Sequence, residues 1–213
     1  TALQTKNIVE VIHLDQSFCA LVNDGSVECW PSSRFTSNPF TAGTNCVYSG
    51  NEFVNGTDCI TKLFKGYNSI LGLKSDGTVV GQLTKTGQTS RGVETIPTGL
   101  SDVVDIVTND GAAVALKSDG SIVVWGEYSD GSNWLSIPDP AVPSGKKVVS
   151  IEKTPVAFAF LLDDKTVITL GRDYYGGCDE DRGETATESK STCKPAGLNT
   201  VESLISNDHS FLA

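Results

Sequence analysis

Six cysteines are the residues whose type and spacing most clearly indicate chemistry. They form three close pairs in the sequence: Cys19 with Cys29, Cys46 with Cys59, and Cys178 with Cys193. The spacing favours a disulfide within each pair, since each bond closes a short local loop. Zinc binding is the rival, but the separations and two distant histidines do not match zinc-ligand spacing. Disulfides in turn indicate an oxidising, extracellular location.

Two loops hold further candidate sites. Asn55-Gly56-Thr57 is an acceptor sequence for an N-linked glycan, in a segment rich in Gly and Asn. Residues 179–188 are rich in carboxylates, whose oxygens suit Ca²⁺. The Asp-x-Asp-x-Asp-Gly spacing is missing there, so we interpret this segment as a solvated acidic loop.

The sequence gives little support for a catalytic function. There is no Gly-x-Ser-x-Gly, P-loop or His-Glu-x-x-His sequence. His13 lies at the end of an expected strand, and His209 occupies a position set by the repeats described below. We therefore predict a protein that is not an enzyme and that has neither a cofactor nor a metal.

Charge and length limit the function classes. The 213 residues have a formal net charge of −10, whereas a nucleic-acid surface needs clustered Lys and Arg. No apolar run is long enough to span a membrane. The expected partners are other copies of the chain or another protein.

One sequence motif recurs along the chain, and the strands that it forms must position these candidate sites. Two β-branched and aromatic runs are joined by an Asp-Gly turn, which predicts a β-hairpin. Copies lie at residues 17–30, 69–82, 112–126 and 157–171, and a fifth begins at Ser210. A further short strand is expected before each hairpin, starting at Ile8, Ile60, Val103, Val148 and Val201. Units of about 45 residues with three or four strands are the size of a propeller blade.

This pattern predicts an all-β, β-propeller-like chain that is a single repeat domain over residues 1–213. It has four complete repeats of about 45 residues plus a partial fifth. The expected blades are residues 8–59, 60–102, 103–147 and 148–200, with a partial blade at 201–213. The insertions that carry the last two cysteine pairs lie at about residues 31–59 and 172–199. The connections after the second and third hairpins are expected to be polar loops.

The phrase at residues 115–126, Ala-Leu-Lys-Ser-Asp-Gly-Ser-Ile-Val-Val-Trp-Gly, resembles the repeat of the regulator of chromosome condensation family. The segment at 171–177 resembles that family's Trp-Gly-x-Asn-x-x-Gly-Gln turn, and His209-Ser210 resembles its His-Ser pair. The family's repeats build seven-bladed β-propellers, so the resemblance implies this fold. The sequence departs from the pattern at Lys165, which replaces Gly, and at Gly81-Gln82, which replaces Trp-Gly. With four complete units in place of seven, closure of a ring stays open.

Three functions follow as hypotheses. The first is an extracellular structural protein that self-associates, even into a filament, through its incomplete terminal blades, unless further repeats complete them. The second is a secreted binding or inhibitor module, as in bacterial β-lactamase inhibitor proteins of this fold. Its expected contact residues are four aromatic side chains: Tyr128, Trp134, Tyr174 and Tyr175. The third is a nucleotide-exchange factor, which the acidity and the disulfides disfavour.

Overall fold

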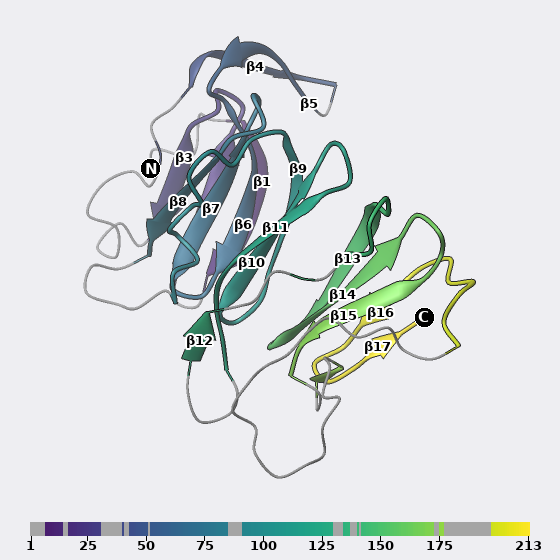
Figure 1. The fold of residues 1–213 in the computed structure, drawn as a ribbon. Coiled ribbons are helices and arrows are strands. Elements are labelled where there is room, and N and C mark those ends of the chain that lie inside the picture. The colour runs from purple at the N-terminus through teal and green to yellow at the C-terminus, as the bar shows by residue number, and fades with distance from the viewer. Residues whose placement is uncertain are drawn as a thin grey trace. The chain divides into compact units, whose positions relative to one another are not determined.

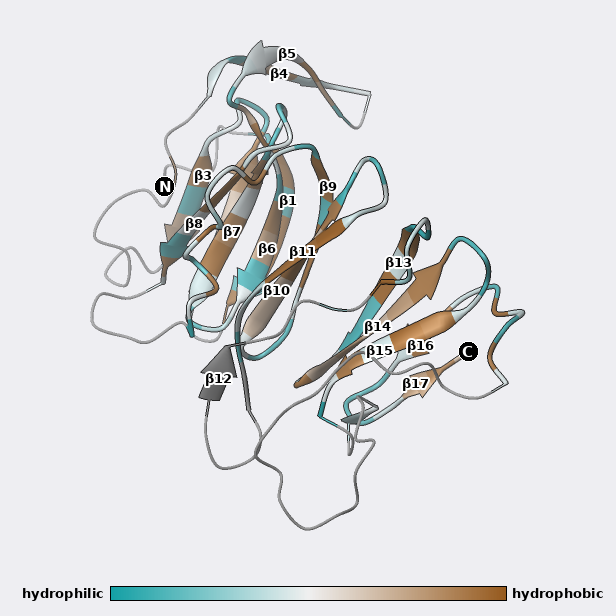
Figure 2. Cartoon of the chain, viewed as in Figure 1, coloured by the Kyte–Doolittle hydropathy of each residue, from teal (hydrophilic) through white to brown (hydrophobic). Residues whose placement is uncertain are grey.

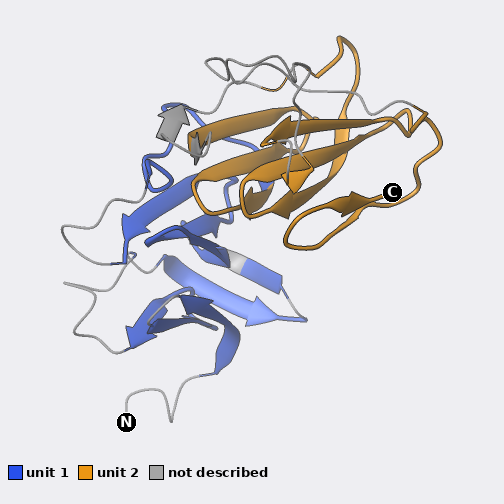
Figure 3. Cartoon of the chain, turned by 90° about the horizontal axis from the view of Figure 1, so that it is seen from below, with its two compact units in different colours: residues 1–104 blue, residues 105–213 orange. Residues whose placement is uncertain are grey.

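The computed structural model is an all-β chain in two compact units, residues 1–104 and 105–213 (Figures 1 and 3). The structure describes residues 7–14, 17–30, 40, 43–50, 52–84, 91–129, 134–136, 140, 142–172, 175–176 and 197–213. Those residues contain strands and turns but no α-helix. Within the same ranges there is accordingly no apolar helix of membrane-spanning length.

The first unit contains two three-stranded antiparallel sheets and a ribbon. Blade 1 is β1 (Ile8–Leu14), β2 (Ser17–Val22) and β3 (Val27–Trp30), in that order. Blade 2 is β6 (Ile60–Gly66), β7 (Ser69–Lys74) and β8 (Val79–Leu83). Between them in sequence, β4 (Thr44–Ser49) and β5 (Glu52–Thr57) pair only with each other in the described structure.

The second unit repeats this arrangement, and the division between the units falls within β9. Blade 3 has four strands, β9 (Val103–Thr108), β10 (Ala112–Lys117), β11 (Ile122–Ser129) and β12 (Trp134–Ser136). Blade 4 is β13 (Val148–Thr154), β14 (Ala157–Leu162) and β15 (Val167–Gly171). The partial blade comprises residues 197–213, with the short hairpin β16 (Ile205–Ser206) and β17 (Phe211–Leu212).

The four expected hairpins share one turn geometry. In each, a residue with positive φ follows the turn aspartate: Gly25 at 75°, Gly77 at 78°, Gly120 at 83° and Lys165 at 67°. The aspartate accepts hydrogen bonds from the amide and the hydroxyl of the Ser or Thr two residues on. For Asp119 the partner is Ser121, at 2.8 and 2.6 Å. This is a three-residue hairpin loop with a left-handed third residue, as the Asp-Gly sequence predicts.

Three details differ from the sequence-based expectations. The strand expected from Val201 is limited to Ile205–Ser206, although Val201 and Leu204 are buried as in a strand that faces a core. The connection after the third hairpin, expected to be a polar loop, contains β12, which is the fourth strand that a unit of three or four strands allows. The ribbon β4–β5 lies in the first insertion, where no strands were expected; its segments contain Asn and Gly, which weaken strand signals.

Hydrophobic residues concentrate on the middle strands, which have a sheet neighbour on both sides (Figure 2). All six residues of β14, from Ala157 to Leu162, are buried. A strand buried on both faces is continuously apolar rather than alternating. The blades are therefore held together by their faces, and the residues on those faces determine what each blade can contact.

Candidate functional site

Within each compact unit, consecutive blades pack face to face, and each blade has two distinct faces. We call the face that packs on the next blade in sequence the back face, and the opposite one the front face. A hydrophobic cluster joins the back face of blade 1 (Cys19, Leu21, Val27) to the front face of blade 2 (Ile60, Leu63, Ile70). Residues of β2 alternate between the faces, so Phe18 lies on the front face of blade 1.

The second unit shows the same front-to-back packing twice. One cluster joins the back face of blade 3 (Ala112, Val114, Val124) to the front face of blade 4 (Val148, Phe158, Phe160, Leu162). Another joins the back face of blade 4 (Ala159, Leu161, Val167) to Val201 and Leu204 of the partial blade, with Phe211 packed against them. In the first of these clusters, the bulky front-face side chains Phe158 and Phe160 meet the smaller back-face side chains Ala112 and Val114.

A backbone hydrogen bond accompanies this packing. The carbonyl of the left-handed turn residue accepts the amide of the first residue of the following blade. The pairs are Gly77 with Val103 at 3.0 Å, Gly120 with Val148 at 2.9 Å, and Lys165 with Val201 at 3.0 Å. The hairpin turn thus forms part of the link to the next blade.

The front face of blade 1 is exposed where the front faces of later blades are buried. Ile8, Val11 and Phe18 are 45%, 51% and 43% exposed. Their counterparts in blade 2, Ile60, Leu63 and Ile70, are 0%, 3% and 0% exposed. The Phe18 ring stacks on Trp30 at 5.9 Å between centroids and contacts His13 at 5.2 Å. Ala20 and Val22 on the same face are buried, so the exposed part is a narrow apolar strip.

The back face of the partial blade is also exposed. Leu212 is 66% exposed, and its counterparts on β2, β10 and β14, namely Cys19, Val114 and Ala159, are each 0% exposed. On the adjacent strand, Ile205 is 59% exposed. Neither side chain belongs to a hydrophobic cluster of the described residues. Residues on the front face of blade 1 and on the back face of the partial blade are therefore exposed, each within its own unit.

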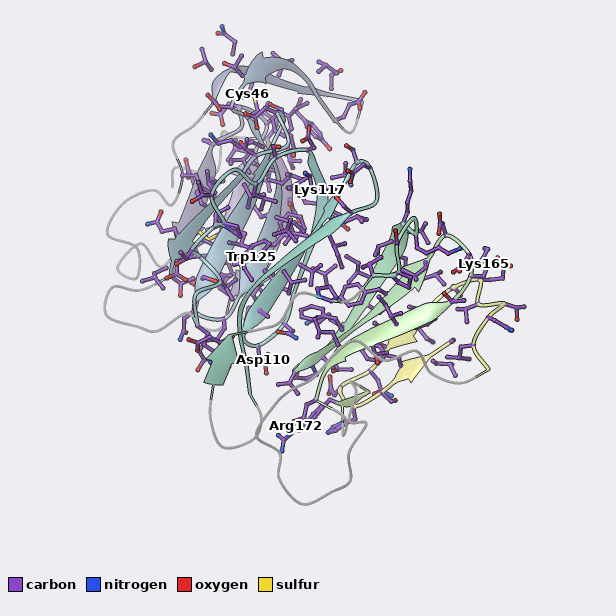
Figure 4. The ribbon with its side chains drawn as sticks, viewed as in Figure 1. Cys46, Asp110, Lys117, Trp125, Lys165 and Arg172 are labelled. Carbon is purple, nitrogen blue, oxygen red and sulfur yellow. A yellow bond between two sulfur atoms is a disulfide. The ribbon has the colours of Figure 1, made fainter. Side chains whose placement is uncertain are left out.

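The partial blade is nevertheless fixed to blade 4 by several contacts. The rings of Tyr175 and His209 stack at 5.2 Å between centroids. The Ser206 hydroxyl donates to Glu152 Oε2 at 2.7 Å. Lys165 Nζ, on the β14–β15 turn labelled in Figure 4, lies 2.7 Å from Glu202 Oε2. These bonds hold β16–β17 in place, so the exposure of Leu212 is that of a positioned surface.

The turn carboxylates are strongly hydrogen-bonded acceptors. Bonds from the Thr166 hydroxyl and from Lys146 lower the pKa of Asp164 to about 2. The hydroxyl and then the amide of Ser121 lower the pKa of Asp119 in the same way. These groups stay ionised at neutral pH and are occupied by their own turns, as expected for structural residues. Within the described ranges, no group of three His, Cys, Asp or Glu side chains is placed to hold a metal.

Two disulfides are present in the described part of the chain. Cys19 and Cys29 lie directly opposite each other on β2 and β3 and are bonded. The second bond joins Cys46 of β4 to Cys59, just before β6. A Cβ on Gly25 would lie 2.7 Å from Cys46 Sγ, so the bond sits against the turn of blade 1. Cys178 and Cys193 lie outside the described residues, as does the acidic segment 179–188.

The other candidate residues lie on different elements. Asn55 is in β5, opposite Val47, between the exposed residues Val54 and Gly56. Tyr128 and Trp134 belong to the β11–β12 ladder. Tyr174 lies outside the described residues, and Tyr175 stacks on His209 as described above.

Sequence reasoning did not find the exposed apolar strips. Ile8, Phe18 and Leu212 have the same residue types as positions that are buried in other blades, so their types alone do not show that they are exposed. Comparing the two outermost repeats with the inner ones, position by position, would have found them.

Solved structures share this arrangement of blades. Yeast RCC1 (Prp20) bound to Kap60 matches with a TM-score of 0.57 and 19% identity, over 95% of this chain and 53% of that one. Prp20p from Saccharomyces cerevisiae matches with 0.57 and 20%, over 92% and 53%. This chain has an RCC1-like β-propeller repeat fold. The receptor kinase CR4 ectodomain from Physcomitrella patens matches with 0.50 and 18%, over 80% and 42%.

The RCC1-like likeness concerns the fold. The chain spans about half the length of the yeast RCC1 structures it matches. No protein-family model and no curated protein sequence matches it. The propeller repeat fold that the resemblance to the regulator of chromosome condensation family implied is therefore confirmed, while the function must be argued from the chain's own surfaces.

Proposed function

We propose that this protein is an extracellular, non-enzymatic interaction module that associates with other copies of itself through its two outermost blades. The observation that carries the proposal is the exposure of Leu212, at 66%, where the same position of inner blades is fully buried. Ile8, Val11 and Phe18 give the same contrast on blade 1. Removing apolar surface of this kind from water stabilises the associated state by roughly 25 cal/mol for each Å² that is buried.

The disulfides support an extracellular site of action. Cys19–Cys29 and Cys46–Cys59 would not persist in a reducing cytosol. A glycan on Asn55 fits the same location, because the flanking Val54, Gly56 and Thr57 are exposed.

Sedimentation velocity over a hundredfold range of protein concentration tests the proposal. We expect the mean mass to rise with concentration for the wild type and to stay at the monomer value for the variant Val11→Asp. Val149→Asp is a matched control, because Val149 is also 51% exposed but lies on β13 of an inner blade. A control that dissociates as readily as Val11→Asp, or a wild type that is monomeric throughout, would refute self-association through these blades. The latter result, combined with stoichiometric capture of a different protein, would favour the binding or inhibitor module.

A further inference from the structure

We infer that the ribbon β4–β5 carries an N-linked glycan on Asn55 whose first sugar packs on Val47 and Val54 and forms part of the folded surface. The inference rests on the extracellular location in the proposed function and is independent of self-association. It assigns an occupant to an apolar surface in the interior of the sequence, between blades 1 and 2.

The ribbon, labelled in Figure 1, has two different faces. The rings of the cross-strand partners Tyr48 and Phe53 lie 5.2 Å apart between centroids, and Phe53 packs against the hydrophobic cluster of blades 1 and 2. Val47 precedes Tyr48 and therefore lies on the opposite face, because side chains alternate along a strand. Val47 and Val54 are 46% and 49% exposed, and neither belongs to a hydrophobic cluster of the described residues. The outer face of the ribbon thus has an apolar centre.

An irregularity in the ladder brings position 55 beside these two valines. Val47 pairs with Asn55 and Tyr48 pairs with Phe53, so Val54 is an extra residue between the two pairs. A bulge of this kind sets two residues of one strand opposite one residue of the other. Cross-strand partners share a face of a ribbon. A group attached at position 55 therefore begins on the face of Val47 and next to Val54.

The acceptor sequence Asn55-Gly56-Thr57 lies on an accessible part of the chain. Gly56 and Thr57 are exposed, and Gly56 has a φ of 108° at a second irregularity of the ladder. Transfer from a lipid-linked oligosaccharide diphosphate forms a bond between the Asn55 amide nitrogen and C1 of the first sugar. The bond from C1 to the diphosphate breaks, the lipid diphosphate leaves, and the amide nitrogen loses one proton.

The first sugar of an N-linked glycan, N-acetylglucosamine, suits this apolar face. Its ring presents C–H groups on its faces and its acetyl group ends in a methyl, while the hydroxyls at the ring edge stay in water. Packing on the valines therefore removes apolar surface from water and leaves the polar groups hydrated. Because an isolated two-stranded ribbon is marginally stable, cover on its outer face should protect it from opening.

Three forms of the secreted chain test the inference. Eukaryotic cells that make only high-mannose glycans supply the full form, endoglycosidase H leaves a single N-acetylglucosamine, and peptide N-glycosidase F removes the glycan and converts the Asn55 amide to a carboxylate. We expect the amides of residues 44–57 to exchange with solvent equally slowly in the first two forms. In the sugar-free form they should exchange roughly fivefold faster, as loss of about 40 Å² of buried apolar surface would give. Asn55→Gln, which lacks the new charge, should exchange as fast as the sugar-free form.

Val47→Ser identifies the contact with the sugar. It should reduce the exchange difference between the single-sugar and sugar-free forms to about twofold or less, because the two changes remove the same contact. Val104→Ser is a matched control and should keep the full difference, since Val104 is 52% exposed but lies on β9.

Several outcomes would overturn the inference. A secreted chain with the same mass as Thr57→Ala, which lacks the acceptor sequence, carries no glycan on Asn55. Equal exchange in all three forms, or a difference that Val47→Ser leaves unchanged, means that the sugar does not pack on Val47. Protection that is lost on trimming to one sugar belongs to the outer sugars instead. None of these results affects self-association, which sedimentation velocity decides separately.

Discussion

The carbonyl oxygen of Lys165 lies 3.0 Å from the amide nitrogen of Val201 and links blade 4 to the partial blade. Gly120 makes the same bond to Val148 between blades 3 and 4. Lys165 reaches this geometry with a φ of 67°, in the left-handed region that glycine adopts at the other turns. The link therefore depends on backbone conformation, and the lysine side chain bears a steric cost that glycine does not.

Replacing Lys165 with glycine is expected to stabilise the protein. Relief of the left-handed conformation is worth about 1 kcal/mol, and the exposed ion pair with Glu202 that is lost contributes about 0.5 kcal/mol or less. We expect a net increase of roughly 0.5 kcal/mol in the free energy of unfolding, measured in urea. Lys165→Ala loses the same ion pair but keeps the strain, so it should be less stable than Lys165→Gly. The opposite order would show that the side chain, rather than the backbone, determines stability here.

Acid should weaken the turn of blade 4 over a defined range of pH. The folded protein holds the pKa of Asp164 at about 2, below the ordinary value of 3.8, through hydrogen bonds from Thr166 and Lys146. A depressed pKa contributes stability that is present above about pH 4 and is lost as the pH falls toward 2. Urea unfolding at pH 5 and pH 2.5 should show a smaller loss for Asp164→Asn than for the wild type. Thr166→Val should reduce the same dependence, because its hydroxyl is the main cause; equal losses in all three proteins would contradict the assignment.

The local chemistry of the blades could be predicted from the sequence. Asp-Gly between two β-branched runs specifies the hairpin, and Cys19 and Cys29 fall opposite each other by counting outward from the turn. Even Lys165, a departure from the glycine pattern, adopts the conformation that the pattern requires. Short-range geometry carries this information, because the turn type fixes the register of both strands.

The exposed faces could not be predicted in the same way. Leu212 and Val114 occupy the same position of a repeat and have similar side chains, yet one is 66% exposed and the other 0%. The difference comes from whether another segment packs on that face, which the local sequence does not specify. The ribbon β4–β5 was missed for a related reason, since it is fixed by Cys46–Cys59 and by contact with Gly25 rather than by strand propensity.

Removing the Cys46–Cys59 bond is expected to release the ribbon β4–β5 more than the blades. Isolated two-stranded ribbons are marginally stable, and this one has the bond to Cys59 near its base. The variant Cys46→Ala/Cys59→Ala should lose about 3 kcal/mol of stability, and its amides at residues 44–57 should exchange with solvent faster. Cys19→Ala/Cys29→Ala is the matched control, because it removes a bond of similar loop length inside blade 1. Equal protection of residues 44–57 in both variants would show that the ribbon is held by other contacts.

In the turns before β10 and β17, an asparagine side chain accepts hydrogen bonds from backbone amides. The first of these asparagines is buried and the second is exposed. Asn109 Oδ1 accepts the amides of Gly111 at 3.2 Å and Ala112 at 3.0 Å, and Asn109 is 8% exposed. Asn207 Oδ1 accepts the amides of His209 and Ser210, both at 2.8 Å, on an exposed turn.

Alanine at these two positions should therefore have unequal effects. Asn109→Ala leaves buried amides without an acceptor and should cost about 2 kcal/mol of unfolding free energy, whereas water replaces the acceptor in Asn207→Ala and limits the loss to about 0.5 kcal/mol. Asn109→Asp keeps the acceptor oxygen and should recover most of the loss. Urea unfolding measures the first variant, and hydrogen exchange at residues 205–212 measures the second. A cost for Asn207→Ala as large as that for Asn109→Ala would mean that the turn of the partial blade is shielded from water in solution, as it would be if another copy covered it.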